Sequence, residues 1–200
     1  MYMVRIFNGH RFWCMDGIHF NPKDNLEKYG YALEGEHAIV LQIKIGSRTF
    51  AVHAVMSERG FEAWIVFEGN VNQHMVANFI ESFAGNFPSD AILFLDNASN
   101  QNNDIVIDTM NRSLGARYQF NEPYSPELNP IEHGFSMVRC WIRDREDQAL
   151  ANPVETINAA FRHYASPRIG GIAGDHCYHL FDFYRRNYDE YVNESIAPLL

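Results

Sequence analysis

Two short apolar runs in the sequence each end in an aspartate. Arg11 to Asp16 reads RFWCMD, and Ala91 to Asp96 reads AILFLD. Apolar strands of this length usually lie in the centre of a sheet, so a carboxylate that ends such a strand sits at the rim, where α/β folds place their sites. If the two strands are parallel neighbours, the carboxylates repel each other, and a divalent cation removes that repulsion. Mg²⁺ and Mn²⁺ are cations that prefer carboxylate oxygen.

Turn formation is the competing explanation for both aspartates. Asp16-Gly17 and Asp96-Asn97 are dipeptides that favour turns. The strand pattern alone therefore leaves two interpretations open, a metal site at the rim of a sheet and a pair of ordinary turns.

A third acid, Glu132, stands at the expected start of a helix. Asn129 suits the N-cap and Pro130 the first helical position, so Glu132 completes a capping-box pattern that accounts for it without chemistry. A residue at a helix start can also point toward the rim of a sheet. Taken alone, Glu132 is explained more simply as part of the cap.

The elements that must position these acids are read from hydrophobic periodicity and turn residues. The expected strands are 11–16, 38–45, 49–56, 62–67, 91–96 and 117–120, with a hairpin turn at Gly46-Ser47. The expected helices are 72–83, 103–114, 154–164 and 175–192, together with a helix after Pro130 that carries Ile131, Phe135, Val138 and Ile142 on one face. Gly115 is a suitable helix stop.

The order of these elements predicts the fold class. Antiparallel-type strands come first, and then helix, strand, helix, strand and helix follow one another. The simplest architecture is an α/β fold with a mixed central sheet and helices on both faces. This order is the one expected of a ribonuclease-H-like fold. We expect residues 1–150 to form the core and residues 151–200 to form a C-terminal helical extension of the same domain.

The composition limits the class of protein. The net charge is -9 and the pI is near 5.4, which is the wrong sign for a stand-alone nucleic-acid-binding protein but suits a catalytic core whose acids hold cations. Arginine, which binds phosphate bidentately, supplies 13 of the 16 cationic residues, although solvated helix faces are the commoner reason for arginines. Three cysteines form no disulfide framework, and no apolar run approaches the length of a membrane span. We expect a soluble intracellular protein, nuclear if the host is eukaryotic.

Two motifs resemble a known family. The stretch from Leu95 to Ser99, LDNAS, and the stretch from Pro123 to Glu132, PYSPELNPIE, resemble the hallmark of the DDE superfamily endonuclease domain of mariner-like and bacterial insertion-sequence transposases. The second string is highly specific. Upstream, Met15-Asp16-Gly17, Gly30-Tyr31-Ala32 and Gly35-Glu36 resemble the first-aspartate strand of the family and the Gly-rich segment after it. The resemblance covers residues 11–144 and continues weakly to residue 178.

The resemblance implies a site and an activity. The three metal-binding acids of the family correspond to Asp16, Asp96 and Glu132, with a gap between the last two that is one residue longer than the usual one. The implied cofactors are two Mg²⁺ or Mn²⁺ ions. The implied activity is metal-dependent cleavage of DNA phosphodiesters and strand transfer in DNA transposition, by in-line displacement at a two-metal site. Asp24 is the nearby alternative to Asp16, but no apolar strand precedes it.

Four further residues are candidates for substrate contact or for support of the acids. Asn97 and Asn129 neighbour the acids in the sequence, and turn formation and helix capping are their alternative explanations. Arg139 and Arg143 lie one turn apart on the helix of the third acid. They could hold a DNA phosphate, or could equally pair with the acids Glu146-Asp147 on the solvent side.

Two positions depart from the family pattern. Gly17 stands where the family often has a glutamate directly after the first aspartate, and Gln101 stands where it often has a histidine. Both departures put the tuning of the site in doubt, while the three acids are intact.

The resemblance also implies partners. These are DNA, as transposon ends and target, and a second copy of the chain in a homodimer. The chain has no room before Arg11 for the helix-turn-helix region of such transposases, so we expect a separate or missing N-terminal DNA-binding domain. The alternative function is a transposon-derived, catalytically silent domain that binds DNA or protein, and the intact acids favour the enzyme. A ribonuclease-H-like nuclease acting on RNA or hybrids is a third option, against which the PYSP string argues.

Overall fold

The computed structural model of the chain describes residues 11–21, 34–35, 48–57, 59–96, 101–121, 129 and 131–165. The strands in these ranges are β1 (Arg11–Phe20), β2 (Phe50–Ser57), β3 (Gly60–Glu68), β4 (Ala91–Leu95) and β5 (Tyr118–Phe120). The helices are α2 (Gln73–Ala84), α3 (Asp104–Leu114), α4 (Ile131–Arg143), α5 (Glu146–Ala151) and α6 (Pro153–Tyr164). The strand expected at 38–45, the hairpin turn at Gly46-Ser47 and the helix expected at 175–192 lie outside the described residues.

The five strands form one mixed sheet in the order β3-β2-β1-β4-β5. The first three strands are antiparallel neighbours, whereas β4 lies parallel to β1 and β5 lies parallel to β4. Parallel neighbours need a crossover connection, and α2 and α3 lie in the connections that lead to β4 and β5. The expected mixed sheet is confirmed.

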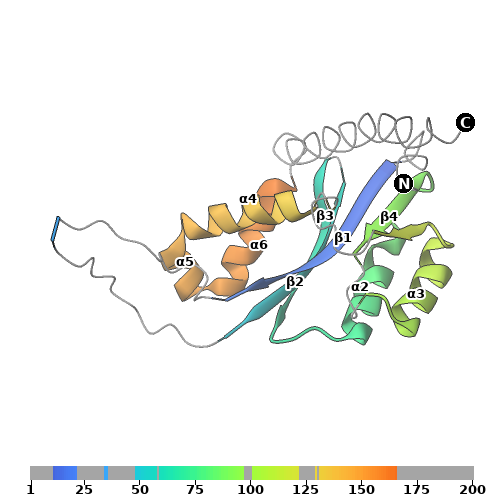
Figure 1. The fold of residues 1–200 in the computed structure, drawn as a ribbon, viewed down its shortest axis with the longest axis horizontal. Coiled ribbons are helices and arrows are strands. Elements are labelled where there is room, and N and C mark those ends of the chain that lie inside the picture. The colour runs from blue at the N-terminus through green and yellow to red at the C-terminus, as the bar shows by residue number, and fades with distance from the viewer. Residues whose placement is uncertain are drawn as a thin grey trace, which may run out of the picture.

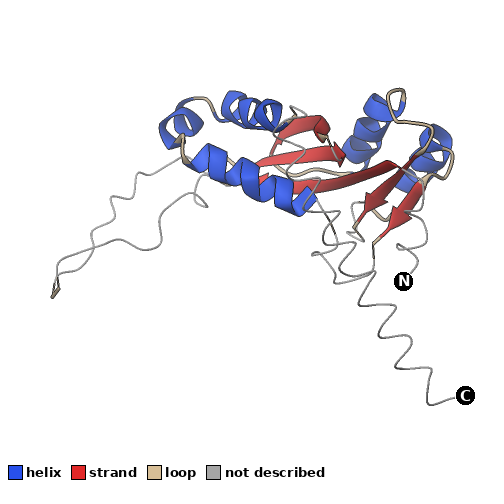
Figure 2. Cartoon of the chain, turned by 90° about the horizontal axis from the view of Figure 1, so that it is seen from above, coloured by secondary structure: helices blue, strands red, loops and turns tan. Residues whose placement is uncertain are grey.

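Helices cover both faces of this sheet (Figures 1 and 2). Successive side chains of a strand point to opposite faces, so Cys14 and Ile18 of β1 belong to a core formed with α4 and α6, whereas Trp13 and Met15 belong to a core formed with α2 and α3. Figure 1 shows α4, α5 and α6 grouped on one side of β1, and α2 and α3 grouped on the other. The chain therefore has two apolar cores with the sheet between them.

Helix ends follow their sequence signals closely. The side chain of Asn72 accepts hydrogen bonds from the His74 and Met75 N–H groups at 3.0 and 3.1 Å and caps α2. Asn103 caps α3 in the same way, and α3 ends at Gly115, whose φ of 60° is left-handed. Helix α5 was not predicted, because its six residues include none that is buried and so carry no apolar period. No helix in the described ranges is long and apolar enough to cross a membrane.

Strand β1 does not end at Asp16, and that expectation is wrong. The strand continues to Phe20 because β2 pairs with it along the whole of this length, from Trp13↔Ser57 to Phe20↔Phe50. The parallel partner β4 leaves β1 earlier, after the pair Met15↔Leu95. Asp16 therefore lies within a strand, at the point where one of its two neighbouring strands ends.

Candidate active site

The sheet brings Asp16 and Asp96 side by side. Met15 and Leu95 form the last pair of the parallel β1–β4 ladder, so the next residue on each chain segment is an aspartate. Adjacent strands lie about 4.8 Å apart. Asp16 is buried, with 7% of its surface exposed, and shares its parity in β1 with Cys14 and Ile18, which face α4 and α6. The two aspartates lie side by side at the C-terminal end of β4, as predicted.

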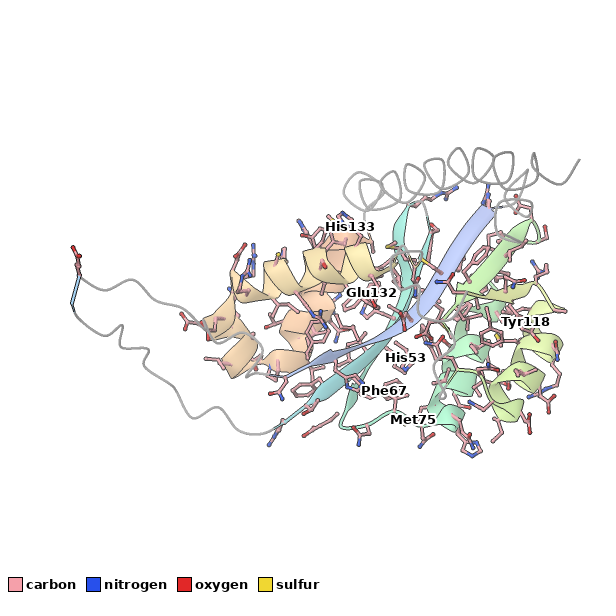
Figure 3. All side chains as sticks on the ribbon, viewed as in Figure 1. His53, Phe67, Met75, Tyr118, Glu132 and His133 are labelled. Atoms are coloured by element: carbon pink, nitrogen blue, oxygen red, sulfur yellow. The ribbon has the colours of Figure 1, made fainter. Side chains whose placement is uncertain are left out.

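Helix α4 carries the third acid to the same place. Its buried residues Ile131, Phe135, Val138 and Ile142 fix one face of the helix against the sheet. Glu132 lies in the first turn, at the helix surface. Figure 3 shows Glu132 at the start of α4, beside β1. The carboxylate is close enough to interact electrostatically with both Asp16 and Asp96.

Burial and charge repulsion disfavour ionisation of Asp16 and Glu132. Burial raises the pKa of Asp16 to about 7, the negative charges of Asp96 and Glu132 add to this rise, and hydrogen bonds from the Gly17 N–H and from Gln101 oppose it. Desolvation around the Glu132 carboxylate also raises its pKa, although the residue as a whole is exposed. Arg139 opposes that rise and Asp96 adds to it. A strongly shifted carboxylate with other acids near it is typical of functional sites.

Three donors hold the Asp16 carboxylate. Oδ1 accepts from the Gly17 N–H at 2.6 Å and from Gln101 Nε2 at 3.1 Å. Oδ2 accepts from Asn129 Nδ2 at 2.9 Å. Gln101, which the sequence marked only as a departure from the family pattern, thus contacts the first acid directly.

The expected role of the Asn129 side chain as a helix cap is wrong. Its amide nitrogen donates to Asp16, and its Oδ1 has no hydrogen-bond partner among the described residues. The first turn is closed instead by the Asn129 backbone carbonyl, which accepts from the Glu132 N–H at 3.2 Å. The amide is drawn to Asp16 because a hydrogen bond to a carboxylate is stronger than one between neutral groups.

The donor set suits a hard divalent cation. One buried carboxylate and two neighbouring ones offer the oxygen ligands that Mg²⁺ and Mn²⁺ prefer. Burial raises the Asp16 pKa most, and a cation would relieve the repulsion that adds to this rise. Among the described residues, no three His, Cys, Asp or Glu side chains already lie close enough together to hold a metal ion. The negative charges of Asp96 and Glu132 act on Asp16 without forming such a group.

His53 is a buried residue on the strand next to Asp16, and its ring lies on the α2 side of the sheet, 6.5 Å from the Phe79 ring between centroids. It lies on β2 directly opposite Gly17 and is 2% exposed. Burial and nearby His19 lower its pKa to about 4. A Cβ at Gly17 would stand 3.0 Å from His53 Cε1 and 3.1 Å from Nε2. The imidazole thus occupies the space that a side chain at position 17 would need, and only the β1–β2 register could have revealed this.

The two candidate arginines of α4 have different neighbours in the structure. The charge of Arg139 lowers the pKa of Glu132, so the two side chains lie near each other. Arg143 lies one turn further along α4, where its Nη2 is 3.6 Å from Cys140 Sγ. Within the described ranges, no ion pair joins either arginine to Glu146 or Asp147. Asn97 lies outside the described residues.

The family is shown by a match over most of the chain. A model of the DDE superfamily endonuclease family matches residues 11–151. The chain belongs to this family. No curated protein matches the sequence.

Solved structures of a transposase share the fold of this DDE superfamily domain. The Mos1 mariner paired end complex with Mn gives a TM-score of 0.64 at 15% identity, covering 90% of this chain and 56% of that chain. The catalytic domain of Mos1 mariner transposase gives 0.57 at 14% identity, covering 90% and 85%. The same domain with Raltegravir and Mg gives 0.54 at 15% identity, covering 86% and 81%. The ribonuclease-H-like fold is therefore confirmed, and the chain spans only 56% of the Mos1 chain in the paired end complex.

Proposed function

We propose that this DDE superfamily domain is the catalytic domain of a transposase, which cleaves DNA phosphodiesters and transfers strands with the help of divalent cations. Asp16, Asp96 and Glu132 are the proposed cation ligands. The observation that carries the proposal is the convergence of three acids from β1, the end of β4 and α4, which together with burial raises the pKa of Asp16 to about 7.

The proposed division of work follows from where each acid lies. Asp16 is buried and held by three hydrogen bonds, so it is the fixed ligand around which a cation would be placed. Asp96 lies beside it, and Glu132 closes the site from the exposed side. Arg139, next to Glu132, is placed to contact a DNA phosphate near the acids. We keep Asn97 and Arg143 as candidate substrate contacts on sequence grounds alone.

The chain itself has mainly to orient groups and balance charge. Two cations, when bound, would supply activation of the attacking hydroxyl and stabilisation of the leaving oxygen in an in-line displacement. The three carboxylates would hold them, and Arg139 would offset part of the charge of the DNA. No covalent link between the chain and DNA is needed.

DNA and a second copy of the chain are the proposed partners. The Mos1 neighbours include a paired end complex and a strand transfer complex, which supports DNA as the substrate here. The net charge of -9 gives this chain little general attraction for DNA. We therefore propose that a separate or additional DNA-binding domain reads the transposon ends, and that two copies act on paired ends.

Metal-dependent nicking of supercoiled plasmid tests the proposal. The purified chain is compared with Asp96→Asn and with a matched control, Asp108→Asn, which alters an exposed aspartate on α3. We expect nicking that needs Mg²⁺ or Mn²⁺, is lost in Asp96→Asn and is kept in the control. Nicking that survives Asp96→Asn would contradict the assignment of the acids.

A transposon-derived domain without activity is the second candidate. It is favoured by one observation, the lack of a ready cluster of three metal-binding side chains among the described residues. Calorimetry with Mn²⁺ separates the two functions. If the parent chain neither binds Mn²⁺ nor nicks DNA, the silent domain is the better account. If it binds Mn²⁺ in an Asp16-dependent way but does not nick, the acids form a working site that needs the DNA-binding partner.

A further inference from the structure

Two side-chain amides enclose the Asp16 carboxylate, one on each oxygen. Gln101 Nε2 donates to Oδ1 at 3.1 Å and Asn129 Nδ2 donates to Oδ2 at 2.9 Å. Gln101 precedes α3 and Asn129 precedes α4, so the two amides come from different parts of the chain, 85 and 113 residues away from Asp16. Neither hydrogen bond is a local consequence of a turn or of a helix end.

Both amides are deeply buried, and only their nitrogen atoms take part in hydrogen bonds to Asp16. Gln101 is 1% exposed and Asn129 is 6% exposed. Within the described residues, Gln101 Oε1 and Asn129 Oδ1 are buried atoms that accept no hydrogen bond. Unpaired buried acceptors are costly, and each one in a native protein calls for an explanation such as a water or an ion.

Packing alone does not account for this arrangement. A buried apolar side chain would fill the same space without leaving an acceptor unpaired, and Asp16 would still be held by the Gly17 N–H at 2.6 Å. Two acceptors without partners, in the two residues that touch one candidate cation ligand, indicate that the amides serve the ligand and its surroundings.

We infer that Gln101 and Asn129 form an amide clamp, which fixes the orientation of the Asp16 carboxylate for cation binding and offers its two free carbonyl oxygens to water in the site. Both residues are positioning residues, since they act through Asp16. A clamped carboxylate loses little rotational freedom when a cation arrives, and residues that orient metal ligands in this way strongly affect metal affinity. Mg²⁺ keeps several waters when bound to proteins, and these need acceptors. The inference rests on the proposed function.

Mn²⁺ affinity of a Gln101→Met variant tests the clamp. Methionine keeps the volume and burial but removes both the donor to Asp16 and the free acceptor. Calorimetric titration of the full chain with Mn²⁺, at about pH 8 so that Asp16 is ionised, should show affinity weakened by about 10–100-fold. The melting temperature without metal should change little, because the lost hydrogen bond to Asp16 is offset by the removal of an unpaired buried acceptor. A structural residue would give the opposite pattern.

Two further variants make the result decisive. Gln148→Met changes an exposed glutamine on α5 and should bind Mn²⁺ like the parent. Gln101→His restores an N–H donor and should recover part of the lost affinity. Unchanged Mn²⁺ affinity in Gln101→Met, or a loss matched by a large fall in melting temperature and not recovered by Gln101→His, would overturn the clamp. Failure of the proposed function is distinct, since the parent chain itself would then bind no Mn²⁺.

Discussion

Asp16 and His53 lie on neighbouring strands and carry opposite pKa shifts. The pKa of Asp16 is raised from 3.8 to about 7, so the folded chain binds more protons there than the unfolded chain, and stability falls as pH rises through this window. The pKa of His53 is lowered from 6.5 to about 4, so stability falls as pH drops through that window. Between pH 4 and 6.5 the two contributions oppose each other.

In Asp16→Asn, the effect of His53 on the pH dependence of stability should no longer be opposed by Asp16. Without metal, the variant lacks the destabilisation that ionised Asp16 causes, so it should be more stable than the parent at neutral pH. As pH falls from 6.5 to 4, the parent gains stability because its folded form takes up a proton at Asp16, and the variant does not. The free energy of unfolding of the variant should therefore fall relative to that of the parent, by up to about 1.4 kcal/mol per pH unit. Urea unfolding at several pH values measures this. Parallel curves for parent and variant would show that Asp16 has an ordinary pKa.

Gly17 is required by its neighbour across the strands. A Cβ at this position would meet the His53 ring at 3.0 to 3.1 Å, so the buried ring would have to shift by a few tenths of an ångström. Gly17→Ala should therefore destabilise the chain by about 1–2 kcal/mol. In a His53→Ala background the same change should cost less, and a double-mutant cycle from urea unfolding gives the coupling. Additive effects would contradict the close contact.

At the scale of elements, α4 approaches the sheet closely at Gly134. A Cβ there would lie 2.8 Å from Met56 Sδ and 2.9 Å from Phe61 Cζ. The methionine can yield, but Phe61 packs against Phe135 and Phe161. The close approach of α4 to the sheet, on which the position of Glu132 depends, thus requires a residue without a side chain.

Gly134→Ala should push the helix away from the sheet. The overpacking should cost about 1–3 kcal/mol, more than the helical preference for alanine returns, and the displaced Glu132 should weaken Mn²⁺ binding. Thermal unfolding and Mn²⁺ calorimetry measure the two effects. Ser136→Ala, on the exposed side of the same helix, is the control and should change neither. A Gly134→Ala chain as stable as the parent would refute the tight contact.

We expect the exposed side of α4 to contact DNA mainly through Arg139. Arg139 acts on Glu132, whereas Arg143 lies a turn away from it. Arg139→Ala should reduce the salt slope of DNA binding by about one and reduce nicking, with a smaller effect on nicking from Arg143→Ala. Arg162→Ala is the matched control, because Arg162 is paired with Glu155 at 2.9 Å on α6. Equal effects of all three changes would mean that α4 has no special contact with DNA.

The sequence predicts elements better than it predicts contacts between them. Periodicity and caps were enough to place α2 and α3 to within a residue, because Asn72, Asn103 and Gly115 act locally. The end of β1 was misplaced, since its length depends on pairing with a strand that is distant in the sequence. The contact of His53 with Gly17 and the place of Gln101 in the site were missed for the same reason. The first contact depends on the register of β2 against β1. The second depends on the path of the chain before α3, which brings Gln101 to Asp16 from 85 residues away.

At the scale of the whole molecule, the site depends on a core that extends beyond the three acids. Phe161 of α6 is fully buried and packs against Phe61 of β3 at a centroid distance of 4.6 Å, against Phe135 of α4 and against Trp64 of β3. The Trp64 indole also donates to Asn158 Oδ1 at 2.9 Å. Helix α6 (Pro153–Tyr164) therefore joins α4 to the sheet, and the extension expected at residues 151–200 as a whole stays a prediction.

Phe161→Ala tests whether that extension and the catalytic core unfold as one. Removal of the ring leaves a cavity between α4, α6 and β3, and should cost about 3–5 kcal/mol. If the domain is a single unit, calorimetry should show one transition, whose midpoint falls as a whole in the variant. Val154→Ala removes an exposed side chain, 44% accessible, from the same helix and should leave the midpoint in place. Two transitions, with only the first shifted by Phe161→Ala, would instead mean that α6 and the acids belong to separate units, and that the position of Glu132 is fixed by α4 and the sheet alone.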